Sequence, residues 1–152
     1  SDEMGSAVHA ASLERPVKLM IALEMIGYYD STPGSQDYPY PAMSWLYPDR
    51  GDFIAVVGRM QDINAVRQVK AALLSSRDLS VYSMNAPGFI PGIDFSDHLN
   101  YWQHDIPAVM ITDTAFYRNK QYHLPGDTAD RLNYQKMAQV VDGVITLLYN
   151  SK

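Results

Sequence analysis

The stretch Ile106-Pro107-Ala108-Val109-Met110-Ile111-Thr112 decides the fold class of this chain. Its apolar residues do not alternate with polar ones and the run is short, which predicts a strand buried on both faces. A polar loop follows, Asn119-Lys120-Gln121-Tyr122-His123-Leu124-Pro125-Gly126-Asp127-Thr128. Open α/β sheets bind ligands beyond the carboxyl ends of their strands. His123 is therefore the first candidate for chemistry.

Further strands and helices are predicted on either side of this run. Residues 17–23, 53–57 and 79–84 predict strands, while residues 30–52 are rich in Pro, Gly, Ser and Tyr and predict a long irregular segment. Helices are expected over residues 4–13, after Asp62 and after Ser96, with both polar residues as caps. The strongest helical period begins at Asn133 and places on one face Met137, Val140, Val141, Val144, Ile145 and Leu148.

Strands that alternate with helices predict a largely parallel sheet covered on both faces. With 152 residues, 47% of them hydrophobic, the chain is long enough for one domain and too short for two ordinary ones. We therefore expect a single α/β domain over residues 1–152.

Composition excludes several classes of function. The formal charge is −5 and the basic residues do not cluster, which argues against a nucleic-acid surface. No apolar run approaches the roughly 20 residues that span a bilayer, so no membrane partner is expected. Because the chain has no cysteine, a metal ion would have to be held by His, Asp or Glu.

Three candidate functional residues, Glu24, Asp97 and His123, each follow a predicted strand. Each also has an ordinary structural role open to it. A carboxylate that ends a strand is usually solvated or caps a helix, and Asp97 lies in the first turn of a predicted helix, where negative charge is favoured. An aromatic beside a loop histidine, such as Tyr122, is more often a packing residue.

Taken together, these residues resemble the co-catalytic zinc aminopeptidases and their relatives, the glutaminyl cyclases. The resemblance covers nearly the whole chain and follows the family's order of motifs. The motifs are Leu23-Glu24-Met25-Ile26-Gly27 at the end of a strand, Ser96-Asp97-His98 before a helix with Trp102, Ile106-Pro107-Ala108, and Tyr122-His123-Leu124-Pro125-Gly126-Asp127-Thr128.

The resemblance implies a three-layer α/β sandwich with a mostly parallel, mixed sheet, of which residues 1–152 form the carboxyl-terminal portion. It implies that Glu24 is a ligand of one zinc ion and His123 of a second, and that metal-activated water hydrolyses an amino-terminal peptide bond. Tyr122 would donate a hydrogen bond to the developing oxyanion. Asp97 would be a buried carboxylate that orients a ligand, and Asp127 would orient His123 or close the turn.

The sequence departs from the family by lacking the His-x-Asp pair and the Glu-Glu pair that supply the bridging ligand and the general base. A catalytic zinc ion generally needs about three protein ligands. We therefore expect an incomplete domain that alone binds zinc weakly and hydrolyses nothing. Sheet edges left open by truncation invite pairing, so we also expect homo-oligomers through such an edge.

Two alternatives stay open. One is a glutaminyl cyclase-like acyltransferase, although the family's cyclases tend to carry tryptophan where Tyr122 stands. The other is a non-catalytic protein-binding module on the same fold. Its recognition surface would be the Tyr- and Pro-rich segment 38–48, which is otherwise an ordered hairpin or lid.

Overall fold

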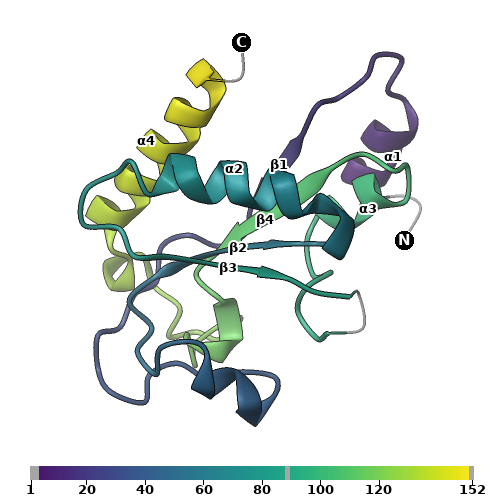
Figure 1. Ribbon diagram of the computed structural model, residues 1–152. Coiled ribbons are helices and arrows are strands. Elements are labelled where there is room, and N and C mark those ends of the chain that lie inside the picture. Colours follow the sequence, from purple (N-terminus) through teal and green to yellow (C-terminus); the bar gives the residue numbers. More distant parts are fainter. Residues whose placement is uncertain (1–3, 88–89, 151–152) are drawn as a thin grey trace.

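Figure 1 shows the computed structural model, which describes residues 4–87 and 90–150. Its centre is a four-stranded sheet in the order β1-β4-β2-β3. The β1–β4 and β2–β3 pairs are parallel, whereas β2 and β4 are antiparallel. The strands are β1 (Met20–Leu23), β2 (Ile54–Gly58), β3 (Val81–Asn85) and β4 (Ala108–Thr112).

Four α-helices cover the two faces of this sheet. They are α1 (Gly5–Ala11), α2 (Ile63–Leu73), α3 (His98–Trp102) and α4 (Tyr134–Asn150). Helices α2 and α4 pack together over one face, and the short α1 and α3 lie over the other (Figure 1). The prediction of a three-layer α/β sandwich with a mixed sheet is confirmed.

Successive side chains of the central strands point to opposite faces of the sheet, so the molecule has two hydrophobic cores, one on each face. Ile54 and Val56 of β2 pack with Val109 and Ile111 of β4 beneath α2 and α4. The intervening residues, including Ala55 and Met110, pack against α1 and α3. The central strands are buried throughout, which explains why their sequences are continuously apolar.

The long segment between β1 and β2 is irregular, as predicted, apart from the 3₁₀ turn η1 (Pro41–Trp45). Other 3₁₀ turns are η2 (Met60–Asp62), η3 (Ala115–Tyr117) and η4 (Ala129–Arg131). No helix in the described part of the chain has the length and apolar character required to cross a membrane.

The predicted helix caps Asp62 and Ser96 are both wrong. Asp62 precedes α2, but its carboxylate accepts hydrogen bonds from Arg59 instead of from the helix, with Nε to Oδ2 at 2.8 Å. Ser96 makes no cap either, because its hydroxyl donates to Glu24. The start of α4 does follow the prediction, since Asn133 Oδ1 accepts the amide of Lys136 at 3.0 Å.

The buried face of α4 matches the predicted one only in part, at Val140 and at the partly buried Val144. Val140, Gly143 and Leu147 are the buried residues, whereas Val141, Ile145 and Leu148 are exposed. The reason is the close approach of α2. A Cβ built on Gly143 would lie 2.9 Å from the Cα of Leu73, so the glycine itself marks the face that touches α2.

Candidate active site

The sheet brings the ends of β1 and β4 together. Leu23 pairs with Ile111, and the amide of Glu24 donates to the Ile111 carbonyl at 2.9 Å. However, β2 is antiparallel to β4 and β3 is parallel to β2. The carboxyl end of β3 therefore lies at the opposite end of the sheet from the carboxyl ends of β1 and β4. Just after β3, the Ala86 amide donates to the Gly58 carbonyl at that far end of the strands. Ser96, ten residues later, donates a hydrogen bond to Glu24 at the other end. Asp97 thus follows a strand that does not end beside Glu24.

Glu24 is half-buried at the carboxyl end of β1. Its Oε2 atom accepts a hydrogen bond from Ser96 Oγ at 3.1 Å. This bond fixes the direction of the carboxylate, which lines two neighbouring cavities. Ser96 is thus a site residue that sequence reasoning treated as a helix cap.

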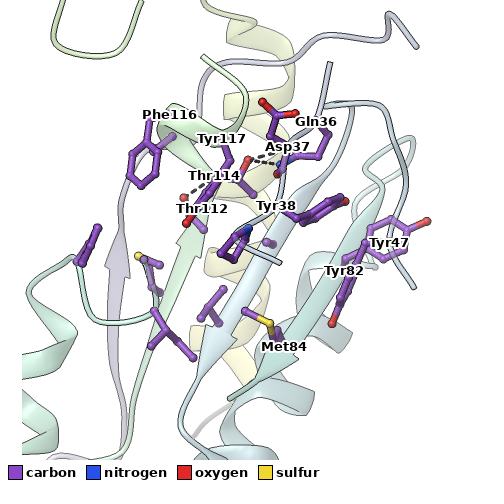
Figure 2. A pocket seen from close by; sticks show the side chains of 18 of the residues that line it. Gln36, Asp37, Tyr38, Tyr47, Tyr82, Met84, Thr112, Thr114, Phe116 and Tyr117 are labelled. Atoms are coloured by element: carbon purple, nitrogen blue, oxygen red, sulfur yellow. Dashed lines mark hydrogen bonds between the residues drawn. The ribbon is translucent and has the colours of Figure 1, made fainter. Parts of the chain in front are cut away.

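The first cavity has a volume of about 110 Å³ and is predominantly apolar. Figure 2 shows Tyr38, Tyr47 and Tyr82 along one side and Phe116 on the other. Burial raises the pKa of Tyr38 to about 12 and also raises the pKa of Tyr47, so both phenols are neutral at physiological pH. Of the described lining residues, only Glu24 and Asp37 carry a charge.

Tyr122 also lines this cavity, although it lies 98 positions after Glu24 in the sequence. The ring of His123 stacks on the ring of Tyr122, with centroids 3.8 Å apart and planes inclined by 18°. His123 has φ of 58°, in the left-handed region, which histidine adopts more readily than most non-glycine residues. His123 is exposed.

The turn that carries Tyr122 and His123 is held by Asn119. Its side-chain amide donates to Asp127 Oδ1 at 2.9 Å, and its Oδ1 accepts from the Gln121 amide at 3.0 Å and from Arg131 Nη1 at 2.8 Å. The Asp127 amide donates to the Leu124 carbonyl at 3.0 Å. Of the two roles proposed for Asp127, the structure shows turn closure.

Asp97 does not lie where the resemblance implied. Its side chain is exposed, and Oδ1 accepts a hydrogen bond from Ser6 Oγ at 2.6 Å. Asn100 donates to the same hydroxyl at 2.7 Å, so these contacts tie α1 to α3. Asp97 lines the second cavity, of about 290 Å³, together with Glu24, but the expected burial of its carboxylate is wrong.

The residues present do not make a complete zinc site. Catalytic zinc is held by about three protein ligands with one position left open. Within residues 4–87 and 90–150, no group of three or more His, Cys, Asp or Glu side chains could hold a metal ion. We therefore derive no catalytic step through a metal from this chain by itself, and the metal roles of Glu24 and His123 remain predictions.

Asp113 is a buried carboxylate that sequence reasoning missed. It follows β4 directly and accepts amide hydrogen bonds from Gly27 at 3.0 Å, Tyr28 at 2.8 Å and Ala115 at 3.0 Å. These bonds join the loop after β1 to the loop after β4. A carboxylate directly after an apolar strand is the same signal that identified Glu24, so the sequence contained the information.

Arg118 is the cationic partner in this buried network. Its Nε donates to Gln36 Oε1 at 2.9 Å, and its Nη1 donates to the carbonyls of Tyr28 at 3.0 Å and Phe53 at 2.9 Å. Burial lowers the pKa of Arg118, and the nearby Asp113 opposes that shift. Through Gln36, Arg118 thereby anchors the irregular segment between β1 and β2, which contributes Tyr38 and Tyr47 to the cavity.

Comparison with known proteins places this chain in a family. The model of Peptidase family M28 matches residues 4–148. The protein YfbL of Escherichia coli (strain K12) is 96% identical over 152 residues, which are 100% of this chain and 47% of YfbL. The chain thus spans about half the length of this curated relative.

Solved structures show the same fold. The LapA aminopeptidase of Legionella pneumophila superposes with a TM-score of 0.66 at 21% identity, covering 94% of this chain and 34% of LapA. BSAP, a zinc aminopeptidase from Bacillus subtilis, gives 0.58 at 15% identity, covering 97% of this chain and 32% of BSAP. Since the family model spans almost all of its residues, this chain belongs to Peptidase family M28.

Proposed function

We propose that this chain supplies one part of the active site of a zinc-dependent aminopeptidase. The observation that supports the proposal is the shared cavity of Glu24 and Tyr122, with the His123 ring stacked on Tyr122. An acidic and a phenolic group thus line one apolar hollow, and an imidazole stacks on the phenol, although the three residues are up to 99 positions apart in sequence. Membership of Peptidase family M28 makes peptide hydrolysis the favoured chemistry.

In this proposal Glu24 and His123 each contribute one ligand to a zinc centre whose other ligands and general base lie outside this chain. Zinc, when bound, supplies an activated water and polarises the scissile carbonyl. Ser96 would hold the Glu24 carboxylate in place through its 3.1 Å hydrogen bond. The chain alone is then inactive, because an incomplete ligand set does not hold the metal firmly.

Tyr122 would donate its phenolic hydrogen bond to the oxygen that becomes negative during hydrolysis. Its position at the cavity, next to His123, places a phenolic donor beside the proposed metal ligand. A donor fixed in place before the reaction stabilises the developing charge without reorganising. The stacked imidazole restricts the tilt of the phenol ring.

The apolar cavity would receive the side chain of the substrate's amino-terminal residue. Its tyrosine, methionine and phenylalanine lining offers burial for a large apolar group and no positive charge for an acidic one. We therefore expect leucine or phenylalanine at the amino terminus to be preferred over glutamate.

Hydrolysis of amino-acid anilides by intact YfbL tests this function. Leucine anilide should be cleaved, and changing the counterpart of Tyr122 to Phe should lower kcat by about 10²- to 10³-fold with little change in KM. Changing the counterpart of exposed His104 to Gln is the matched control and should leave kcat unchanged. Cyclisation of peptides with amino-terminal glutamine, without anilide cleavage, would instead support the acyltransferase alternative.

A further inference from the structure

Hydrogen bonds close a ring that joins the loop after β1 to the loop after β4. Asp113 Oδ2 accepts the amide of Tyr28 at 2.8 Å, and Asp113 Oδ1 accepts the amide of Ala115 at 3.0 Å. The Ala115 carbonyl accepts the amide of Asn119 at 2.7 Å, and Asn119 Oδ1 accepts from Arg131 Nη1 at 2.8 Å. Arg131 Nη2 donates to the hydroxyl of Tyr28 at 3.1 Å and thereby completes the ring.

The contact between Tyr28 and Arg131 combines two kinds of interaction. Besides the hydrogen bond, the guanidinium carbon of Arg131 lies 4.7 Å from the centroid of the Tyr28 ring, which is within the range of a cation–π contact. Arg131 Nη1 also donates to the Gly126 carbonyl at 3.3 Å. One half-buried guanidinium therefore connects Tyr28 to both ends of the turn, at Asn119 and at Gly126.

The turn over residues 119–127 needs such support from outside. His123 lies in the left-handed region with φ of 58°, and a non-glycine residue stays there only where surrounding contacts determine its conformation. The stack of His123 on Tyr122 lies within the turn, so it does not tie the turn to the rest of the molecule. The ion pair of Lys120 with Asp37 is exposed and holds the turn only weakly.

We infer that Tyr28 and Arg131 are positioning residues. Through their contact, the loop that begins at Glu24 sets the place of the turn that carries Tyr122 and His123. Tyr28 lies four residues after Glu24, and neither Tyr28 nor Arg131 lines the two cavities. Their effect on a reaction is therefore on the geometry of the site. That effect on catalysis rests on the proposed function, whereas the link itself is a property of this chain.

Tyr28→Phe and Tyr29→Phe form a matched pair of variants in this chain. The hydroxyl of Tyr29 is buried and has no hydrogen-bond partner within the described residues, so its removal should be without effect on the turn. Hydrogen exchange of the Gln121 amide, which donates to a side chain of the ring at 3.0 Å, measures the order of the turn. Tyr28→Phe should speed this exchange about 10-fold, because it deletes a hydrogen bond from a charged donor. The Leu46 amide, which bonds Met43 in the remote turn η1, should exchange at the wild-type rate in both variants.

Intact YfbL tests the consequence for catalysis. The counterpart of Tyr28→Phe should lower kcat for leucine anilide about 10-fold with little change in KM, because a misplaced turn costs rate more than binding. The counterpart of Tyr29→Phe should leave both constants unchanged. Faster exchange of the Gln121 amide with an unchanged kcat in active YfbL would overturn the positioning role.

Equal exchange of the Gln121 amide in the wild type and in Tyr28→Phe would overturn the link itself. Arg131→Met, which removes the guanidinium, should speed the exchange at least as much and replaces Tyr28→Phe if that variant is not recovered folded. Adding Tyr28→Phe to Arg131→Met should have no further effect, since both changes delete the same contact, and additive effects would also contradict the inference. Faster exchange in Tyr28→Phe, with no anilide hydrolysis by wild-type YfbL, would support the link and remove the proposed function.

Discussion

His98 is a fully buried histidine in the loop-to-helix junction next to Ser96. Its Nε2 lies 2.6 Å from the Ile93 carbonyl, and its ring meets Trp102 edge-on with centroids 4.5 Å apart. Its Nδ1 has no hydrogen-bond partner within the part of the chain that the structure describes. Burial lowers the pKa of His98 below its ordinary value of 6.5, although the Ile93 carbonyl and nearby aspartates oppose the shift.

This burial predicts a loss of stability in mild acid. Because the folded-state pKa of His98 is depressed, the unfolded chain binds more protons as the pH falls through about 6.5. The free energy of unfolding therefore decreases from there down to the folded-state pKa, with a slope of at most about 1.4 kcal/mol per pH unit. Urea unfolding at pH 7.5 and pH 5.5 should show a smaller pH dependence for His98→Gln than for the wild type. His104→Gln, at an exposed position, should retain the full dependence, and equal slopes in all three proteins would contradict the assignment.

At the scale of residues, the sequence located Glu24, Tyr122 and His123 in loops that the structure gathers near one cavity. It could not predict that Ser96, and not Asp97, reaches Glu24. Neighbouring residues before a short helix point in different directions, and the choice depends on α1, which offers Ser6 to Asp97. Asp113 was missed although the strand before it, within the run 106–112, was predicted.

Gly143 sets the distance between helices α2 and α4. Helix propensity alone would make Gly143→Ala stabilising by about 1 kcal/mol. A methyl group here would, however, lie 2.7 Å from Leu73 Cδ2 and 2.9 Å from Leu73 Cα. The side-chain atom can move, but the backbone atom moves only if the helices separate.

We therefore expect Gly143→Ala to destabilise the chain by about 1–3 kcal/mol in denaturant unfolding. Asp142→Ala, one residue away on the exposed side of α4, is the matched control and should change the stability by less than about 0.5 kcal/mol. A Gly143→Ala variant that is more stable than the wild type would show that propensity outweighs this contact.

At the scale of elements, period and composition predicted every strand and the two long helices to within a few residues. The sequence did not reveal which apolar stripe of α4 is buried. Val141, Ile145 and Leu148 are as apolar as their buried neighbours, so the pattern describes a helix with two apolar sides. Only the close approach of α2 at Gly143 selects between them.

At the scale of the whole molecule, alternation of strands and helices predicted the layers but not the direction of each strand. The antiparallel β2–β4 pair is set by long loops whose paths leave no periodic signal. Its consequence is functional, since the loop after β3 must return from the far edge before Ser96 can contact Glu24.

Two features predict association of the isolated chain: the edge that β1 forms within the described residues, and the exposed residues Val141, Ile145 and Leu148 of α4. In the absence of the rest of a YfbL-like protein, apolar edges of two copies pair weakly. Light scattering should give a mass that rises with concentration, and Ile145→Lys with Leu148→Lys should reduce that rise. A mass that stays at that of one chain at high concentration would count against self-association.

The central claim is that Glu24 and His123 contribute to one zinc centre when the molecule is whole. The most direct measurement is anomalous diffraction at the zinc edge from crystals of intact YfbL grown with zinc. The account predicts peaks at about 2.0–2.2 Å from the carboxylate that corresponds to Glu24 and from the imidazole that corresponds to His123. Zinc bound elsewhere, with these two side chains remote from every peak, would contradict it.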